Sequence, residues 1–375
     1  PKFLVAEDGS AGQRNTVTCG AIEHKMGIRG SATAVLNFDE AIGHLIFEPN
    51  KGLEAMFTFM NTARLGIAIQ GVAHAEASFQ GALAYAKERR SMRALSGKKE
   101  PEASADALIW HADVRRMLLT QKAIAEGGRA MLYAAVQTAD LMFNAAFEKD
   151  HANYEHYDNE LGFYTPILKG FLTEMGLEAA NLGMQVFGGH GYIHEHGMEQ
   201  IARDARIATL YEGTTGIQAL DLLGRKVLIG TRGKCVRDFT RIMLRLARRH
   251  VFASGPIGSM ARSTMRRAIE WNILTLRILL RAGKDRDLVG SASVDYLMYS
   301  GYVMMGYYFV LQAEKAQTLL LNGKGNESAD FYRAKIQTAA FYFDRLLPRA
   351  DAHRKSALAP THSLMQMDNG HFAFV

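Results

Sequence analysis

A carboxylate followed by small and hydroxyl-bearing residues is the feature of this sequence best suited to chemistry. Glu212 stands between Tyr211 and Gly213, and Thr214 and Thr215 follow at the expected start of a helix. A carboxylate in an apolar, water-poor pocket can act as a general base. The same glutamate can instead be an acid at a helix N-terminus that interacts with the helix dipole and with Thr214. Spacing alone leaves both interpretations open.

A glycine-rich turn lies upstream of this glutamate. The string QVFGGHGY, residues 185–192, interrupts a helical pattern at Gly188-Gly189-His190-Gly191. It is not a GxGxxG motif and does not follow a strand, which excludes a Rossmann turn. Such a turn, together with the helix start at Thr214, still offers free backbone N–H groups to an anion. Pyrophosphate binding is therefore one interpretation of this turn.

Other reactive side chains do not form a recognisable site. His190, His194 and His196 lie close together, but no HExxH pattern accompanies them, so we expect no metal site. We expect their ring nitrogens to form hydrogen bonds with the backbone or with a phosphate. The two cysteines, Cys19 and Cys235, provide neither a disulfide framework nor a CxxC pair, which fits a reducing cytoplasm. GxSxG and P-loop motifs are absent from the sequence.

The elements that must position these residues change in type near residue 50. Residues 16–22 and 31–38 alternate in the manner of strands, and a third strand is predicted at His44–Glu48. From Gly52 onward apolar residues recur at helical spacing, and an alanine-rich helix is predicted to continue from Leu65 to Arg89.

Long helices account for most of the remaining chain. A polar loop at 94–106, which we expect to be disordered, separates the first helix from predicted helices at about 109–147 and 161–187. Glycines at 230–233 predict a boundary, and the residues beyond it again have the pattern of long amphipathic helices.

Composition limits the class of protein. With 375 residues, 48% of them hydrophobic and 22% charged, the chain can bury a large core and has the length of two or three domains. Residues 1–8 do not have the pattern of a signal peptide. The uncharged stretch 296–312 falls short of the ~18 apolar residues of a membrane span, so we predict a buried bundle helix there. A net charge of +6 fits phosphate-bearing ligands, nucleic acid or a basic globular protein without such a partner, and does not decide among them.

Several dispersed strings resemble the acyl-CoA dehydrogenase family, in the family's order. RDARIATLYEGTTGIQ, residues 203–218, with the preceding QVFGGHGY, resembles its C-terminal signature. Residues 25–31 resemble its strand segment before the helical domain, and 61–64 with 85–89 resemble its first long helix. The resemblance covers about residues 15–230. These flavoenzymes desaturate acyl-CoA thioesters between the α and β carbons.

The resemblance assigns roles to individual residues. It implies that Glu212 removes the α-proton while the β-hydrogen leaves as hydride to the flavin N5. The enolate-like oxygen would be stabilised by the backbone N–H of the base residue and by a flavin ribityl hydroxyl. Asn61, Thr62, Ala63 and Arg64 match the stretch that contacts acyl-CoA, with Arg64 as its cation, and Gly213 is expected to line the substrate.

The same resemblance implies FAD as cofactor. A neighbouring subunit supplies part of the flavin site in the family, so a homodimer is expected, with electrons passing to an electron-transfer flavoprotein. The chain departs from the family pattern at Met92, Ala112 and Gly216. The residues at the expected flavin positions are Arg89, Ser91, His111, Gln185, Val186, Phe187, Gly188, Gly189 and Thr214.

Both ends of the chain differ from the short members of the family. Family members begin with a helical domain and the first half of a β-domain, so this chain resembles the C-terminal portion of a longer enzyme. The residues after 231 resemble the extra helical domain of a longer subfamily that includes enzymes acting on 3-methylthiopropionyl-CoA. Five arginines between Arg237 and Arg249 form a basic stripe on the first of these helices. We expect it to be solvated or paired with acids of a neighbouring subunit, although nucleic acid or an anionic membrane surface would also suit it.

Together these observations predict a mainly α protein: a partial β-domain at 1–50, an acyl-CoA dehydrogenase-like four-helix bundle at 51–230 and a second helical bundle at 231–375. The expected function is FAD-dependent α,β-dehydrogenation of an acyl-CoA to the 2-enoyl-CoA in the cytoplasm, without a transmembrane segment. Two alternatives remain: a non-catalytic helical interaction or DNA-binding relative of the family, and an acyl-CoA oxidase.

Overall fold

The computed structural model describes residues 1–374, except for the side chains of Phe57, Thr58 and Asn61. The chain divides into two compact units, Pro1–Thr62 and Ala63–Val375. Each unit is described by itself. The fold is mainly helical, as predicted, with its few strands confined to the first unit.

The first unit consists of two antiparallel hairpins and the beginning of a helix. Strands β3 (Val17–Ile22) and β4 (Ala34–Phe38) confirm two predicted strands, whereas β1 (Phe3–Val5) and β2 (Ala11–Arg14) were not predicted. The predicted strand at His44–Glu48 is wrong, because that segment is coil. A strand requires a partner ladder, and alternation in sequence does not supply one. Just before this segment, the buried Asn15 side chain holds both backbone polar groups of Ile42.

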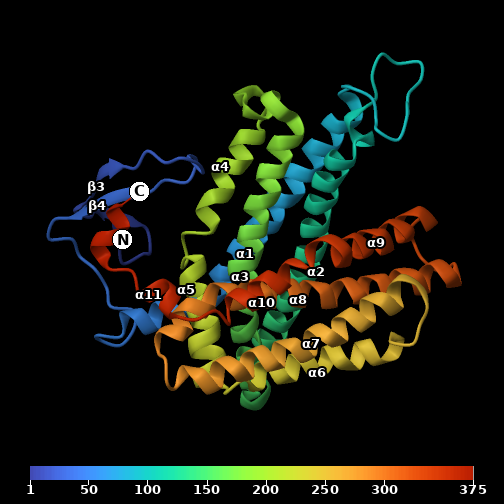
Figure 1. The fold of residues 1–375 in the computed structure, drawn as a ribbon. Helices are drawn as coiled ribbons and strands as arrows, with labels where there is room; N and C mark the ends of the chain where they lie inside the picture. Colours follow the sequence, from blue (N-terminus) through green and yellow to red (C-terminus); the bar gives the residue numbers. More distant parts are fainter. Residues whose placement is uncertain (375) are drawn as a thin grey trace. The chain divides into compact units, whose positions relative to one another are not determined.

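Three long helices form the first part of the helical unit. They are α1 (Gly52–Glu88), whose residues from Ala63 onward belong to this unit, α2 (Ala112–Phe147) and α3 (His151–Phe187). Figure 1 shows the three running side by side. The buried hydroxyl of Ser78 on α1 lies 3.0 Å from both Gln121 Oε1 on α2 and the Ala179 carbonyl oxygen on α3, within hydrogen-bond distance of each. This contact joins all three helices in the core.

Short elements follow the glycine-rich turn. They are η2 (Gly188–Tyr192), η3 (His194–His196), α4 (Met198–Ala208) and α5 (Thr215–Leu220), which continues into a π-helical segment, η4 (Asp221–Gly230). The Thr214 hydroxyl caps α5 by accepting the N–H of Ile217 at 3.3 Å, as expected for a helix start there. α4 and α5 pack against α3, so the residues between them lie close to its surface.

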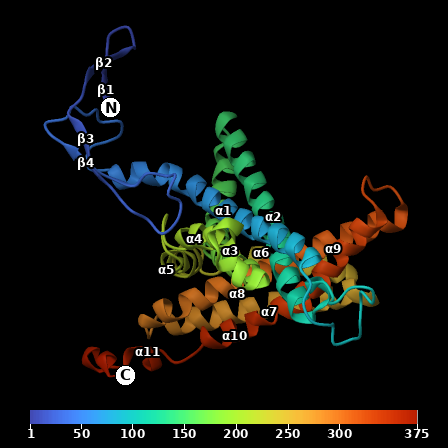
Figure 2. The same ribbon diagram turned by 90° about the horizontal axis from the view of Figure 1, so that it is seen from above.

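The remaining helices pack around α8 (Asp287–Asn322), which contacts α3, α5, α7, α9 and α10. Figure 2 shows α7, α8 and α10 alongside one another. Trp271, Tyr296 and Tyr299 are fully buried here, which confirms the predicted bundle helix at 296–312. None of the described helices has the length and apolarity needed to cross a bilayer. The other elements are α6 (Lys234–His250), α7 (Gly255–Ala282), α9 (Ala329–Phe341), η5 (Tyr342–Leu346), α10 (Arg349–Ser356), α11 (His362–Met365) and η6 (Asn369–Ala373).

The predicted basic stripe lies along the exposed side of α6. Asp238 pairs with Arg241 at 2.8 Å, and Glu314 on α8 pairs with Arg249 at 3.0 Å. The stripe is therefore partly neutralised within the chain. Its arginines, all exposed, are Arg237, Arg241, Arg245, Arg248 and Arg249.

Candidate active site

Glu212 lies in a left-handed turn between α4 and α5. Its φ is +56°, and Gly213 follows at +91°. A left-handed conformation costs a non-glycine residue roughly 1–2 kcal/mol and is concentrated at functional sites. One carboxylate oxygen, Oε2, is shielded from solvent and has no hydrogen-bond partner among the described groups. A shielded, unpartnered carboxylate oxygen is well suited to accept a proton from a bound molecule.

Two fully buried side chains hold the backbone of this turn. Gln218 Nε2 on α5 donates to the Glu212 carbonyl at 3.0 Å, and Lys169 Nζ on α3 donates to the Gly213 carbonyl at 2.6 Å. The carbonyl groups on both sides of the turn are thus occupied. Within the described part of the chain, the N–H groups of Glu212, Gly213 and Thr214 donate to no acceptor.

Charged groups of both signs surround the turn. Arg64 on α1 is 6% exposed and lies 3.7 Å from Asp221 at the start of η4, measured from Nη1 to Oδ2. The Thr215 hydroxyl donates to Glu174 of α3 at 2.5 Å. Burial and the nearby Arg64 lower the pKa of Lys169 to about 8, against the opposing charges of Glu174 and Glu212. The site thus contains a buried lysine close to the candidate base and a buried arginine close to that lysine.

The predicted substrate stretch is only partly described. Arg64 and Gly213 belong to this site, and Ala63, the residue before Arg64 on α1, is half-buried. Thr62 is exposed and belongs to the first unit, and the side chain of Asn61 lies outside the described residues.

A cavity of about 420 Å³ lies where α1 ends beside the glycine-rich turn. Tyr85 stacks on Phe187 with ring centroids 4.0 Å apart, and its hydroxyl lies 2.8 Å from His190 Nδ1. Of the nine predicted flavin positions, seven line this cavity and two do not, namely His111 and Thr214. Those lining it are Arg89, Ser91, Gln185, Val186, Phe187, Gly188 and Gly189.

The cavity provides groups for an anion. The exposed guanidinium of Arg89 has neither hydrogen bond nor ion pair among the described groups, and Gly188 has a φ of +60° with open space beside it. A free guanidinium next to an accessible glycine backbone suits a diphosphate. These residues therefore fit the anionic part of a dinucleotide such as FAD.

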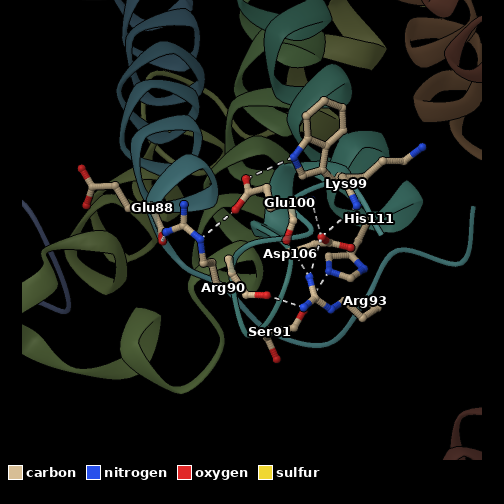
Figure 3. Close-up of polar contacts among 10 residues, drawn as sticks. Glu88, Arg90, Ser91, Arg93, Lys99, Glu100, Asp106 and His111 are labelled. Atoms are coloured by element: carbon tan, nitrogen blue, oxygen red, sulfur yellow. Dashed lines mark hydrogen bonds and ion pairs between the residues drawn. The ribbon is translucent and has the colours of Figure 1, made fainter. Parts of the chain in front are cut away.

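The loop at 94–106 is ordered, contrary to the prediction of disorder. Figure 3 shows polar groups converging on Asp106. Its carboxylate accepts the N–H groups of Ala94, Lys99 and Glu100 at 2.8–3.0 Å and the Arg93 guanidinium at 3.1 Å. These donors, the Ala94 N–H foremost, hold the pKa of Asp106 well below its usual range.

His111 contacts the backbone just before this loop. Its ring Nε2 lies 2.9 Å from the Ser91 carbonyl, so it fixes the backbone beside the cavity rather than lining it (Figure 3). Arg90 donates to Glu100 at 2.7 Å across the same loop. Two predicted flavin positions, Ser91 and His111, are thus tied to one another.

The rings of the three clustered histidines contact neighbouring side chains. His194 lies 2.5 Å from Glu199, and the rings of His190 and His196 stack at 4.9 Å. No group of three or more metal-binding side chains occurs in the described chain.

Several residues of the site were not predicted, namely Lys169, Gln218, Glu174 and Asp221. Lys169 had a sequence signal, because it is the only charge in the apolar run from Leu161 to Thr173. Gln218 ends the string at residues 203–218 but was given no role, and Glu174 and Asp221 had no signal, because their roles depend on helices that meet only in the folded chain.

Comparison with known families agrees with the resemblance found in the sequence. Residues 50–228 match the family model described as "Acyl-CoA dehydrogenase, C-terminal domain", and residues 240–368 match "Acetyl-CoA dehydrogenase C-terminal like". The chain is 39% identical over 97% of its length to 3-methylmercaptopropionyl-CoA dehydrogenase of Ruegeria pomeroyi, and 30% identical over 99% to the broad-specificity linear acyl-CoA dehydrogenase FadE5 of Mycobacterium tuberculosis. It spans 60% and 62% of those relatives.

Solved structures show the same fold. A Bacillus anthracis acyl-CoA dehydrogenase complexed with FAD superposes with a TM-score of 0.72 at 19% identity, over 95% of this chain and 58% of the other. Caenorhabditis elegans ACDH-11 in complex with C11-CoA superposes with a TM-score of 0.72 at 17% identity, over 94% of this chain and 58% of the other.

Proposed function

Because the chain belongs to the acyl-CoA dehydrogenase family, we propose that it carries the catalytic base and part of the flavin site of an FAD-dependent acyl-CoA dehydrogenase. The reaction is removal of one hydrogen from each of the α and β carbons of a thioester, which yields the 2-enoyl-CoA. The observation that carries this proposal is the shielded, unpartnered Oε2 of Glu212.

The turn supports abstraction of a proton next to a thioester. Glu212 takes the α-proton through its free carboxylate oxygen. The negative charge that develops on the thioester oxygen needs donors, and the N–H of Glu212 is free to donate. Bound FAD supplies the acceptor for the β-hydrogen and its electron pair. The protein thus provides the base and an oxyanion donor from one left-handed turn.

The cavity beside the glycine-rich turn supports FAD binding. Arg89 and the Gly188–Gly189 backbone would hold the diphosphate, with Tyr85 and Phe187 as the apolar wall. Ser91 and Gln185 supply polar contacts at its edge. Thr214 lies in the other turn and is proposed to contact the flavin from there. A second copy of the chain would complete this site, which makes a homodimer part of the proposal.

The proposed substrate is an acyl-CoA, and the proposed electron acceptor is an electron-transfer flavoprotein. The proteins of R. pomeroyi and M. tuberculosis are named for a sulfur-containing and for linear acyl groups, respectively. Both substrate classes should be tested. Turnover with the electron-transfer flavoprotein and without hydrogen peroxide would support a dehydrogenase, whereas peroxide formation would identify an oxidase.

The experiment is an absorbance spectrum of the purified protein between 350 and 500 nm, followed by short, medium and sulfur-containing acyl-CoAs. We expect flavin bands that bleach with one thioester. Glu212→Gln should keep the bands but not bleach, because its side chain cannot take the proton. Glu155→Gln, on an exposed part of α3, is the matched control and should bleach normally. Bleaching by Glu212→Gln at the wild-type rate would exclude Glu212 as the base.

A further inference from the structure

Lys169 is an ammonium in the middle of an apolar helix face. Its side chain is 0% exposed, and the residues from Leu161 to Gly170 are all buried. Placing a charge there is costly unless other groups compensate for the lost water. If this side chain only filled space, a methionine of similar length would give a more stable folded protein than a lysine.

The compensating contact is made to the catalytic turn. Lys169 Nζ donates to the Gly213 carbonyl at 2.6 Å, and no carboxylate forms an ion pair with it among the described residues. At the next residue of α3, Gly170, the neighbour is the apolar Leu297 of α8. The charge of Lys169 is therefore directed at the turn and not at a structural acid.

The Glu212–Gly213 turn has a backbone conformation that hydrogen bonds of this kind can stabilise. Glu212 and Gly213 are both left-handed, with φ of +56° and +91°. Gln218 holds the Glu212 carbonyl from α5, and Lys169 holds the next carbonyl from α3. These two contacts fix the 212–213 and 213–214 peptide planes from two different helices, and so restrain the backbone of the residue that carries the carboxylate.

We propose that Lys169 is a positioning residue for Glu212, and that its ammonium form holds the Glu212–Gly213 turn in the geometry required for proton abstraction. This rests on the proposed function. Neutral lysine is a weaker donor to a carbonyl than ammonium. The turn should therefore lose part of its support when Lys169 loses its proton, and turnover should fall with it.

The charged groups near Lys169 influence the pH at which it loses its proton. Arg64 from α1 disfavours the ammonium, Glu174 from α3 and Glu212 from the turn favour it, and burial outweighs both, which gives a pKa of about 8. Asp221 of η4 is the ion-pair partner of Arg64. Burial raises the pKa of Tyr211 and lowers that of His74 on α1, so neither of these groups is shifted toward the pKa of Lys169. A fall in turnover near pH 8 is thus expected from Lys169.

The test compares Lys169→Met with Lys226→Met, a half-buried lysine elsewhere in the same helical unit, as the matched control. Each protein is assayed from pH 6 to 10 with an acyl-CoA and an artificial electron acceptor. Exchange of the thioester α-proton in D₂O is followed separately, because it requires the base but not the β-hydrogen step.

We expect Lys169→Met to lower kcat and α-proton exchange by roughly 10- to 100-fold with KM changed by less than about 3-fold, since a misplaced catalytic group costs this much. The fall near pH 8 should disappear, whereas Lys226→Met should keep the wild-type profile. A folded Lys169→Met protein with wild-type kcat and the same alkaline fall would overturn the proposal.

Two further outcomes are distinguishable. If Lys169→Met does not fold, the wild-type profile decides, because the absence of any fall in kcat between pH 7 and 9 contradicts a role for the ammonium form. If the wild-type protein shows neither turnover nor α-proton exchange with any acyl-CoA, the proposed function itself fails, and the role of Lys169 fails with it.

Discussion

Gly71 on α1 and Gly176 on α3 meet backbone to backbone. A Cβ added to Gly176 would lie 2.4 Å from the Gly71 carbonyl oxygen, and one added to Gly71 would lie 2.4 Å from that of Leu172. This close crossing lets the next turns of the two helices bring Arg64 and Lys169 to the same side of the bundle. The spacing of the site thus depends on two residues that take no part in its chemistry.

Gly176→Ala should therefore destabilise the protein by about 2 to 3 kcal/mol, because the clash is with backbone that cannot turn away. Gly66→Ala, on an exposed part of α1 with open space around it, is the matched control. It should be neutral or stabilise by up to ~1 kcal/mol, as alanine is the better helix former. Urea denaturation measures both, and equal effects would contradict a close crossing.

Asp221→Asn should cost about 3 kcal/mol, because it leaves Arg64 buried without its counter-charge. The two side chains are 7% and 11% exposed. Asp238→Asn, which disrupts a pair on the exposed side of α6, should cost less than about 1 kcal/mol. Thermal unfolding of the two variants provides the comparison. A larger loss for Asp238→Asn would show that burial does not determine the cost.

Asp106→Asn should loosen the loop at 94–106, because an amide cannot accept from all the N–H groups that the carboxylate serves. Limited proteolysis should cleave this loop faster in the variant. Asp113→Asn, at an exposed carboxylate on α2, should leave cleavage unchanged.

The same carboxylate predicts a pH dependence. Because the pKa of Asp106 is lower in the folded protein than in the unfolded chain, its stabilisation is complete above the ordinary aspartate value of about 3.9. It is lost as the pH falls below that value toward the lowered one. Wild-type loop cleavage by an acid-active protease should therefore rise only below about pH 4, and a rise beginning near neutral pH would contradict this assignment.

Arg89→Gln should weaken FAD binding by roughly 10- to 100-fold, the effect of losing one hydrogen bond to a charged group. Quenching of flavin fluorescence on binding gives the dissociation constant. Arg277→Gln, at an exposed arginine of α7, is the control and should bind FAD as the wild type does. Unchanged affinity in Arg89→Gln would remove this guanidinium from the proposed diphosphate site.

The helical class, the approximate helix positions and the two turns that carry the candidate chemistry could all be predicted from the sequence. Helical periodicity located α1 and α2, and the helix start at Thr214 was predicted from local residue types. The start of α3 was missed by ten residues, because the polar segment from His151 has no apolar repeat. Signals of this kind are local, so they survive in a single sequence.

The tertiary structure decided which of these residues act together. Strand pairing excluded a strand at 44–48, and the carboxylate of Asp106 ordered a loop that its composition marked as disordered. The contact between Lys169 and Gly213 joins residues 44 positions apart. Such contacts depend on how helices cross, and the crossing of α1 and α3 is set by the absence of side chains at Gly71 and Gly176, which no periodicity reveals.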